Sequence, residues 1–194
     1  DSALARSLLE EALLLNREIG DKEGIAVSSS LSAELALIQN DPATARSLAE
    51  ESLVLYREME YRKGIAESLS FLARIATVRG DYASASALCN ECLAIAKELG
   101  DRELLASVLE RLAGVMAAQE SGGIHTKRAL WAAKLWGAAE SLREAIGGPI
   151  PPLERATYEC AVTAIRTQLG EETFAAAWAE GRNMTPDQAL AAQG

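Results

Sequence analysis

The first 120 residues of this chain nearly repeat themselves with a period of 40. Positions that coincide when the sequence is shifted by 40 carry the same residue, as in Asp1, Asp41 and Asp81; Ala5, Ala45 and Ala85; Leu13, Leu53 and Leu93; and Glu18, Glu58 and Glu98. Repetition at this period is typical of helix pairs that bury their apolar faces by stacking on their neighbours. The pattern therefore predicts an all-α fold, an α-α superhelix of antiparallel helix pairs.

Turn signals divide the repeats further. Gly20-Asp21, Gly80-Asp81 and Gly100-Asp101 each combine a glycine that can end a helix in the left-handed conformation with an aspartate that can cap the next helix. Asn40-Asp41 does the same with asparagine. These signals predict helices near 2-19, 22-39, 42-59, 62-79, 82-99 and 102-119. Such short turns make neighbouring helices antiparallel.

Mostly small residues recur on one face of alternate helices, at spacings of four and then three residues. The pattern appears as Ala5, Leu9 and Ala12, then as Ala45, Ala49 and Ser52, then as Ala85, Cys89 and Cys92. Together with Gly80-Asp81-Tyr82, this spacing resembles the tetratricopeptide repeat over roughly 1-120. The usual period of that repeat is about 34 residues, so the resemblance implies longer helices or turns here.

The final third of the chain follows a different pattern. Glycines interrupt the repeats after residue 120, and a long helix is expected from near Thr126 to a Pro-rich turn at 147-152. A helix to about Leu169 and a short one at 174-180 come next, and Thr185-Pro186-Asp187-Gln188 predicts a capping box that opens a last helix. We expect tetratricopeptide-like repeats over 1-120, and a last repeat helix with a C-terminal helical cap, continuous with the solenoid, over 121-194.

Motifs in this last region resemble the C-terminal part of bacterial multidomain regulators. They are Trp136-Gly137-Ala138-Ala139-Glu140, Leu169-Gly170-Glu171-Glu172-Thr173-Phe174, Ala177-Trp178-Ala179-Glu180-Gly181 and Thr185-Pro186-Asp187-Gln188-Ala189. In that family an ATPase module precedes tetratricopeptide-like repeats, and some members carry a LuxR-type helix-turn-helix domain. The resemblance implies a sensor or interaction arm. The chain begins at Asp1, inside a repeat, so we also expect further repeats upstream.

Composition excludes several classes of partner. A formal charge of -9 opposes extended contact with nucleic acid or anionic lipid. No apolar stretch reaches the roughly 18 residues that a membrane helix needs. Three cysteines spread over a long chain do not form the dense disulfide framework of a small secreted domain. We expect a cytoplasmic protein that binds no membrane and no nucleic acid directly.

No catalytic motif emerges from the sequence. Cys89 and Cys92 form a Cys-x-x-Cys pair, but they occupy packing positions of the repeat, and His125 lies in an interrupted turn with no nucleophile arranged around it. A phosphate-binding loop is also missing. We predict no cofactor, no metal and no catalysis. Trp131, Trp136 and Trp178 are interpreted as a cap over the last repeat, with an aromatic ligand pocket as the alternative.

The resemblance to tetratricopeptide repeats implies a concave binding surface on the first helix of each pair. Polar residues predicted to lie there, off the packing stripe, are Ser30, Glu34, Glu67, Ser70, Arg74, Ser107 and Glu110. Ordinary solvent exposure is the competing interpretation. The implied partner is a protein, a peptide or a small effector, together with other modules of the parent chain.

The sequence thus favours the non-catalytic binding arm of a bacterial transcriptional regulator. A stand-alone adaptor, or a scaffold that self-associates into a homo-oligomer, is the alternative. An enzyme with an aromatic pocket around Trp136 and Trp178 ranks below both, because no nucleophile, base or metal cluster accompanies those rings.

Overall fold

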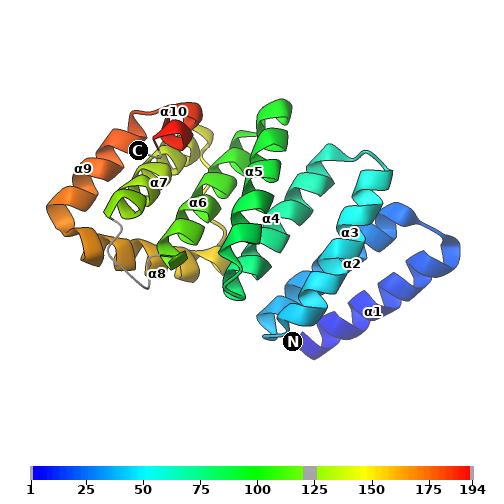
Figure 1. The fold of residues 1–194 in the computed structure, drawn as a ribbon. Helices are drawn as coiled ribbons and strands as arrows, with labels where there is room; N and C mark the ends of the chain where they lie inside the picture. The colour runs from blue at the N-terminus through cyan, green and yellow to red at the C-terminus, as the bar shows by residue number, and fades with distance from the viewer. Residues whose placement is uncertain (1, 120–125, 193–194) are drawn as a thin grey trace. The chain divides into compact units, whose positions relative to one another are not determined.

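The computed structural model describes residues 2–119 and 126–192, and within these ranges the chain is all-α and contains no strand (Figure 1). This confirms the predicted fold class. The described helices are α1 (Ser2–Ile19), α2 (Lys22–Ile38), α3 (Pro42–Glu58), α4 (Arg62–Val78), α5 (Tyr82–Leu99), α6 (Arg102–Gln119), α7 (Thr126–Ile146), α8 (Pro152–Leu169), α9 (Glu171–Arg182) and α10 (Pro186–Ala191). The helices of the repeats begin and end within one residue of their predicted limits.

Tertiary contacts divide the chain into two compact units. Unit 1 is Asp1–Ile95 and unit 2 is Ala96–Gly194, so the boundary lies inside α5. The sequence pattern places its boundary at residue 120 instead, because the repeat ends there. None of the described helices is long and apolar enough to cross a membrane.

Three turns of unit 1 follow the predicted signals, and the turn between α3 and α4 is built differently. Gly20, Asn40 and Gly80 all have positive φ, as a left-handed helix end requires. Between α3 and α4 the equivalent position is Glu60, a non-glycine residue with φ 54°. The next residue, Tyr61, makes no side-chain capping bond to α4. This turn therefore lacks the glycine or asparagine that adopts a positive φ easily, and it lacks the aspartate that caps the next helix.

Aspartate caps α2, α3 and α5 of unit 1. Asp21 accepts a hydrogen bond from the Gly24 amide at the start of α2, and Asp41 accepts one from the Thr44 amide at the start of α3, both at 3.1 Å. Each bond satisfies an amide that the first helical turn leaves without a partner.

Small residues bring the helices of unit 1 together. Helix α2 packs against α1 and α3, and α3 packs in turn against α4. The fully buried residues between these helices are mostly alanines, namely Ala26, Ala33, Ala45, Ala66 and Ala73. At the surface, Arg17 reaches Glu51 at 2.6 Å and Arg57 reaches Glu91 at 2.7 Å. These two ion pairs are the same contact, repeated 40 residues later.

Unit 2 is organised around α7, which packs against α6, α8, α9 and α10. Glycines allow α7 and α9 to approach closely. A Cβ added to Gly181 would lie 2.1 Å from the carbonyl oxygen of Lys134, and one added to Gly137 would lie 2.2 Å from that of Trp178. Only glycine fits at this helix crossing without a shift of backbone.

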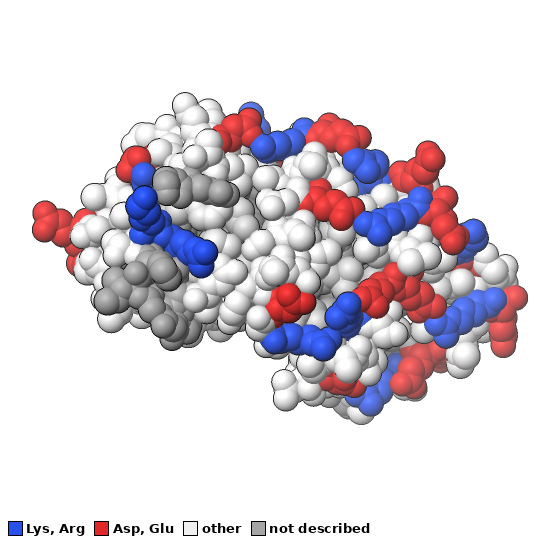
Figure 2. All heavy atoms as spheres, in the orientation of Figure 1, with Lys and Arg blue, Asp and Glu red and all other residues white. Residues whose placement is uncertain are grey.

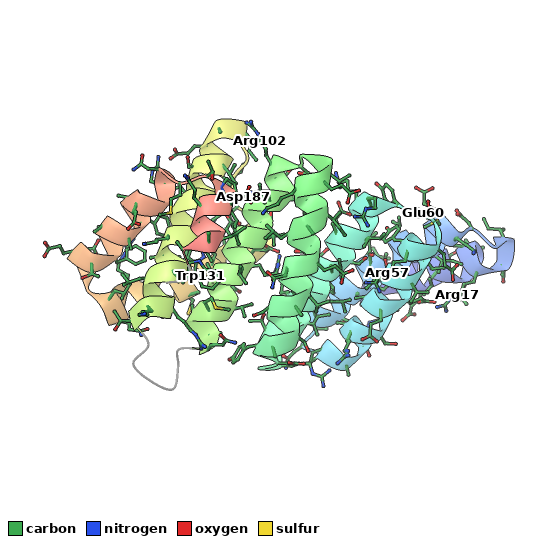
Figure 3. The ribbon with its side chains drawn as sticks, turned by 45° about the horizontal axis from the view of Figure 1, so that its top comes forward. Arg17, Arg57, Glu60, Arg102, Trp131 and Asp187 are labelled. Atoms are coloured by element: carbon green, nitrogen blue, oxygen red, sulfur yellow. The ribbon has the colours of Figure 1, made fainter. Side chains whose placement is uncertain are left out.

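Helix α10 closes over α7 in unit 2 (Figure 3). The Trp131 indole nitrogen donates a hydrogen bond to the carbonyl oxygen of Ala189 at 2.8 Å, and Lys97 forms an ion pair with Asp187. The predicted capping box is present, with Thr185 and Gln188 bonding reciprocally.

Candidate binding surface

Five of the predicted site residues lie on two helices of unit 1. Ser30 and Glu34 are on α2, and Glu67, Ser70 and Arg74 are on α4. Position 34 of one repeat is equivalent to position 74 of the next. These equivalent side chains meet across the two helices, since Glu34 Oε1 lies 3.8 Å from Arg74 Nη2. The structure therefore brings Glu34 of α2 and Arg74 of α4 together.

Ser70 is an exception, because its side chain is buried. The prediction that it lies off the packing stripe is wrong. Its repeat equivalent, Ser30, is half-buried, and its hydroxyl oxygen is 2.6 Å from that of Ser52. Ser52 in turn lies 3.4 Å from Ser68. This position of the repeat turns toward the neighbouring helix, where a small hydroxyl can be satisfied internally.

Ser107 and Glu110 belong to unit 2, and both bond to Arg143. Arg143 Nε donates to one oxygen of Glu110 at 2.6 Å and Nη2 donates to the other at 2.8 Å, while Nη2 also donates to Ser107 Oγ at 3.0 Å. The carbonyl oxygens of Gly148 and Pro149 accept bonds from Nη1. Glu110 is buried, so the prediction of a surface position is also wrong for it. Its exact repeat equivalent is Ser70, which turns inward too.

The electrostatics of this buried pair depend on its hydrogen bonds. The bonds to Glu110 raise the pKa of the Arg143 guanidinium. Burial raises the pKa of the Glu110 carboxyl, and the guanidinium acts against that rise. A pair of this kind stabilises a structure only while both partners are present.

Apolar side chains that the sequence prediction passed over complete the surface on α2 and α4. Val27 and Leu31 are 42% and 48% exposed. Phe71 is half-buried, and the Arg74 guanidinium carbon lies 4.6 Å from its ring centroid, at cation-π distance. We call Val27, Leu31, Glu34, Phe71 and Arg74 the α2–α4 face. Their signal was available in the spacing 27, 31, 34, which places side chains on one side of a helix.

A second feature of unit 1 is a pocket of about 450 Å³ between α3 and α5, over α4. We call it the α3–α5 pocket. Leu72, Ile75 and Leu88 contribute apolar lining. Its polar lining residues are Arg46, Glu50, Arg79, Asp81, Ser84 and Glu91. Apolar lining with a few convergent polar groups is common in ligand sites.

Most of the charges around this pocket already have partners inside the protein. Glu50 pairs with Arg46 at 2.7 Å, and Glu91 pairs with Arg57. Hydrogen bonds from Ser84 lower the pKa of Asp81. Arg79 forms no ion pair with any residue that the structure describes, although its charge adds to the lowering of the Asp81 pKa.

The charged side chains of unit 1 alternate in sign. In Figure 2, basic and acidic residues are interspersed over its helices, and no large area of one sign stands out on this face. On this face, the described side chains form no continuous basic track of the kind that follows a nucleic-acid backbone.

Two of the three cysteines are packing residues, and the third, Cys160, is exposed. Cys89 and Cys92 are buried, as their repeat positions predict, and the Cys92 thiol donates to the carbonyl oxygen of Ala66 at 3.1 Å. Over 2–119 and 126–192, no group of three or more His, Cys, Asp or Glu side chains could hold a metal ion. His125 lies outside the described residues.

The tryptophans of unit 2 are engaged in packing. Trp131 and Trp136 are buried, and Trp136 meets Tyr158 edge-on with 6.1 Å between ring centroids. Trp178 is half-buried and donates to Glu140 at 2.6 Å. These contacts agree with the packing interpretation of the three rings.

Comparison with known proteins adds no assignment, because no family model matches the chain and no curated protein is significantly similar to it in sequence. The resemblances to tetratricopeptide repeats and to bacterial regulators rest on the sequence motifs alone.

Proposed function

We propose that this chain is a non-catalytic binding module and that its α2–α4 face binds a segment of a partner protein. The observation that carries the proposal is the exposed apolar surface of Val27 and Leu31 beside the Glu34 and Arg74 pair. Apolar side chains grouped with an arginine and an aromatic ring have the composition of protein interfaces.

Each part of the face has a distinct task in this proposal. Val27 and Leu31 provide apolar area that a partner's side chains cover. Arg74 is held between the Phe71 ring and Glu34, so less side-chain freedom is lost when a partner contacts it. The charges fix the orientation of the partner segment along the two helices.

Within the parent chain, we propose that this module is the sensor or interaction arm of a cytoplasmic bacterial transcriptional regulator. The motifs of the last third support this role. Binding would regulate neighbouring modules only if the partner prefers one of two arrangements of them. Sequencing the coding region on both sides tests the assignment. An adjacent ATPase module supports it, and a short gene that encodes neither ATPase nor helix-turn-helix contradicts it.

A small effector in the α3–α5 pocket is the second candidate. Arg79 favours it, because this guanidinium lines the pocket and forms no ion pair within the described chain. An effector with a carboxylate or phosphate group would complement Arg79, and its apolar part would contact Leu72 and Leu88.

One experiment separates the two candidates. A random peptide library displayed on phage is selected against the whole protein, and the dissociation constant of the best peptide is measured by fluorescence anisotropy. Arg74→Glu and Leu31→Asp should each weaken binding by about tenfold or more. Arg79→Glu is the matched control, since it makes the same charge change at the residue that directly follows α4. Circular dichroism melting confirms that each variant is folded.

The pattern of losses decides the outcome. If Arg74→Glu and Leu31→Asp bind the peptide as tightly as the unmodified protein, the α2–α4 face is not the binding surface. If only Arg79→Glu abolishes binding of the peptide, the binding site is the α3–α5 pocket.

A further inference from the structure

Helix α1 has an apolar face that nothing in the described chain covers. It packs against α2, whereas α3 packs against both α2 and α4. Leu4, Leu8, Leu15 and Ile19 are each more than half exposed. Their spacing places them along one side of the helix. We call these four residues the α1 face.

The repeat shows that this exposure is unusual for a helix of this type. Ala45 on α3 and Ala85 on α5 are fully buried, but their equivalent on α1, Ala5, is exposed. Leu48 on α3 is half-buried, and its equivalent Leu8 is 56% exposed. Because the repeat positions are the same, the difference comes from the neighbours. Helix α3 is preceded by the pair α1 and α2, and α1 has no such pair before it in the described residues.

The contacts of α3 with its preceding pair are specific. Arg17 of α1 reaches Glu51 at 2.6 Å, and Lys22 of α2 reaches Glu58 at 2.8 Å. The Ser29 hydroxyl donates a further bond to Glu51 at 2.9 Å. Two acidic residues of α3 thus form two ion pairs with the preceding helix pair, and one of them also accepts a hydrogen bond from a serine hydroxyl of that pair.

Helix α1 carries both of these acids at the equivalent positions. Glu11 corresponds to Glu51, and Glu18 corresponds to Glu58, each exactly one repeat earlier. Neither Glu11 nor Glu18 forms an ion pair with any described residue. Helix α1 therefore carries the two acids of this contact, and the cations that would pair with them are those at the positions of Arg17 and Lys22 in a preceding helix pair.

We propose that the α1 face is a docking site for a helix pair of this same repeat type, with Arg or Lys at the positions of Arg17 and Lys22. The incoming pair covers the apolar face, and its two cations meet Glu11 and Glu18. This surface is separate from the α2–α4 face, so the proposal does not depend on the proposed function.

A second copy of the chain is a poorer occupant. Two α1 helices could pair antiparallel, with Leu4 against Ile19 and Leu8 against Leu15 of the other copy. That pairing places both copies of Glu11 beside the two-fold axis, where their like charges repel. A helix pair with cations at the two positions satisfies the same acids instead.

The test adds the proposed occupant in its correct register. A copy of residues 1–40 is fused directly before Asp1 of the whole chain, so that its Asn40 precedes Asp1 as Asn40 precedes Asp41. Hydrogen–deuterium exchange is then followed in the original α1, which comes after the added copy in the fusion. If the added pair docks, the amides of α1 should exchange at least about tenfold more slowly than in the unmodified protein, because helix opening now requires undocking.

A charge-reversed fusion is the matched control. Arg17→Glu and Lys22→Glu in the added copy should remove most of the protection, and Glu11→Lys with Glu18→Lys in the original α1 should restore it. Unchanged exchange of α1 in the first fusion would overturn the proposal. So would protection of α1 in the unmodified protein that rises with its concentration, since a second copy would then be the occupant.

Discussion

Units 1 and 2 are both helical, yet they are held together by different kinds of contact. In unit 1 an ion pair recurs after 40 residues, and its two copies, Arg17 with Glu51 and Arg57 with Glu91, are about a third to a half exposed. In unit 2 the pair of Arg143 and Glu110 is buried, and the contacts around it have no counterpart one repeat away. A surface built from repeated contacts can accept a further copy, whereas the contacts of unit 2 depend on single residues.

The tryptophans allow the two units to be followed separately. All three lie in unit 2, at positions 131, 136 and 178. Tryptophan fluorescence therefore reports unit 2 during denaturation, and circular dichroism reports the helices of both units. Substitutions in one unit can be compared with substitutions in the other by these two signals.

The largest effect is expected for Arg143→Leu. The change leaves the Glu110 carboxylate buried without its guanidinium, and removing one partner of a buried pair costs about 3–5 kcal/mol. The fluorescence transition in urea should move to much lower denaturant. The double variant Arg143→Leu with Glu110→Leu should recover most of the loss, because no buried charge remains. A single variant as stable as the unmodified protein would show that the pair is not needed.

Gly181→Ala should be the next most destabilising change. Its methyl group would overlap the carbonyl oxygen of Lys134 at the crossing of α7 and α9, and such overpacking costs about 2–3 kcal/mol. Gly114→Ala in α6 is the control, because the added carbon meets no atom within 4 Å beyond the adjacent backbone of its own helix, and alanine is favoured inside a helix. The control should raise stability slightly. Equal effects of the two changes would argue against a close crossing.

Glu60→Gly should stabilise unit 1. Glu60 has a left-handed backbone between α3 and α4, which glycine adopts without steric cost, and we expect a net gain of about 0.5–1 kcal/mol. Gly20→Ala, at the equivalent position one repeat earlier, should change stability in the opposite direction. The circular dichroism transition should move while the fluorescence transition stays in place. A loss of stability in Glu60→Gly would mean that its side chain outweighs the backbone strain.

Arg57→Ala should have the smallest effect. Arg57 and Glu91 are about half exposed, and surface ion pairs of this kind contribute about 0.5 kcal/mol or less. High salt should remove the difference between the variant and the unmodified protein. A loss as large as that of Arg143→Leu would remove the contrast between the exposed and the buried ion pairs.

The sequence predicted local structure well because the signals for it are local. The turn at Asn40, the caps at Asp21 and Asp41, and the capping box at Thr185 all depend on residues within a few positions of one another. The repeat adds independent copies of the same signal, so helix limits in the first 120 residues could be predicted closely.

The side-chain environment of the site could be predicted only in part. Glu34 and Arg74 were placed on a shared face because repeat equivalents lie side by side. Glu110 was misplaced because its partner, Arg143, lies 33 residues away in a segment that does not repeat. Val27 and Leu31 were missed because only polar residues were predicted to bind, although these two apolar side chains are 42% and 48% exposed.

Hydrogen–deuterium exchange with a saturating amount of the selected peptide tests the central claim most directly. Binding to the α2–α4 face predicts slower exchange in α2 and α4 around Leu31 and Arg74, and unchanged exchange in α7 and α9. Protection confined to α7 and α9, with none in α2 and α4, would contradict the claim that unit 1 provides the binding surface.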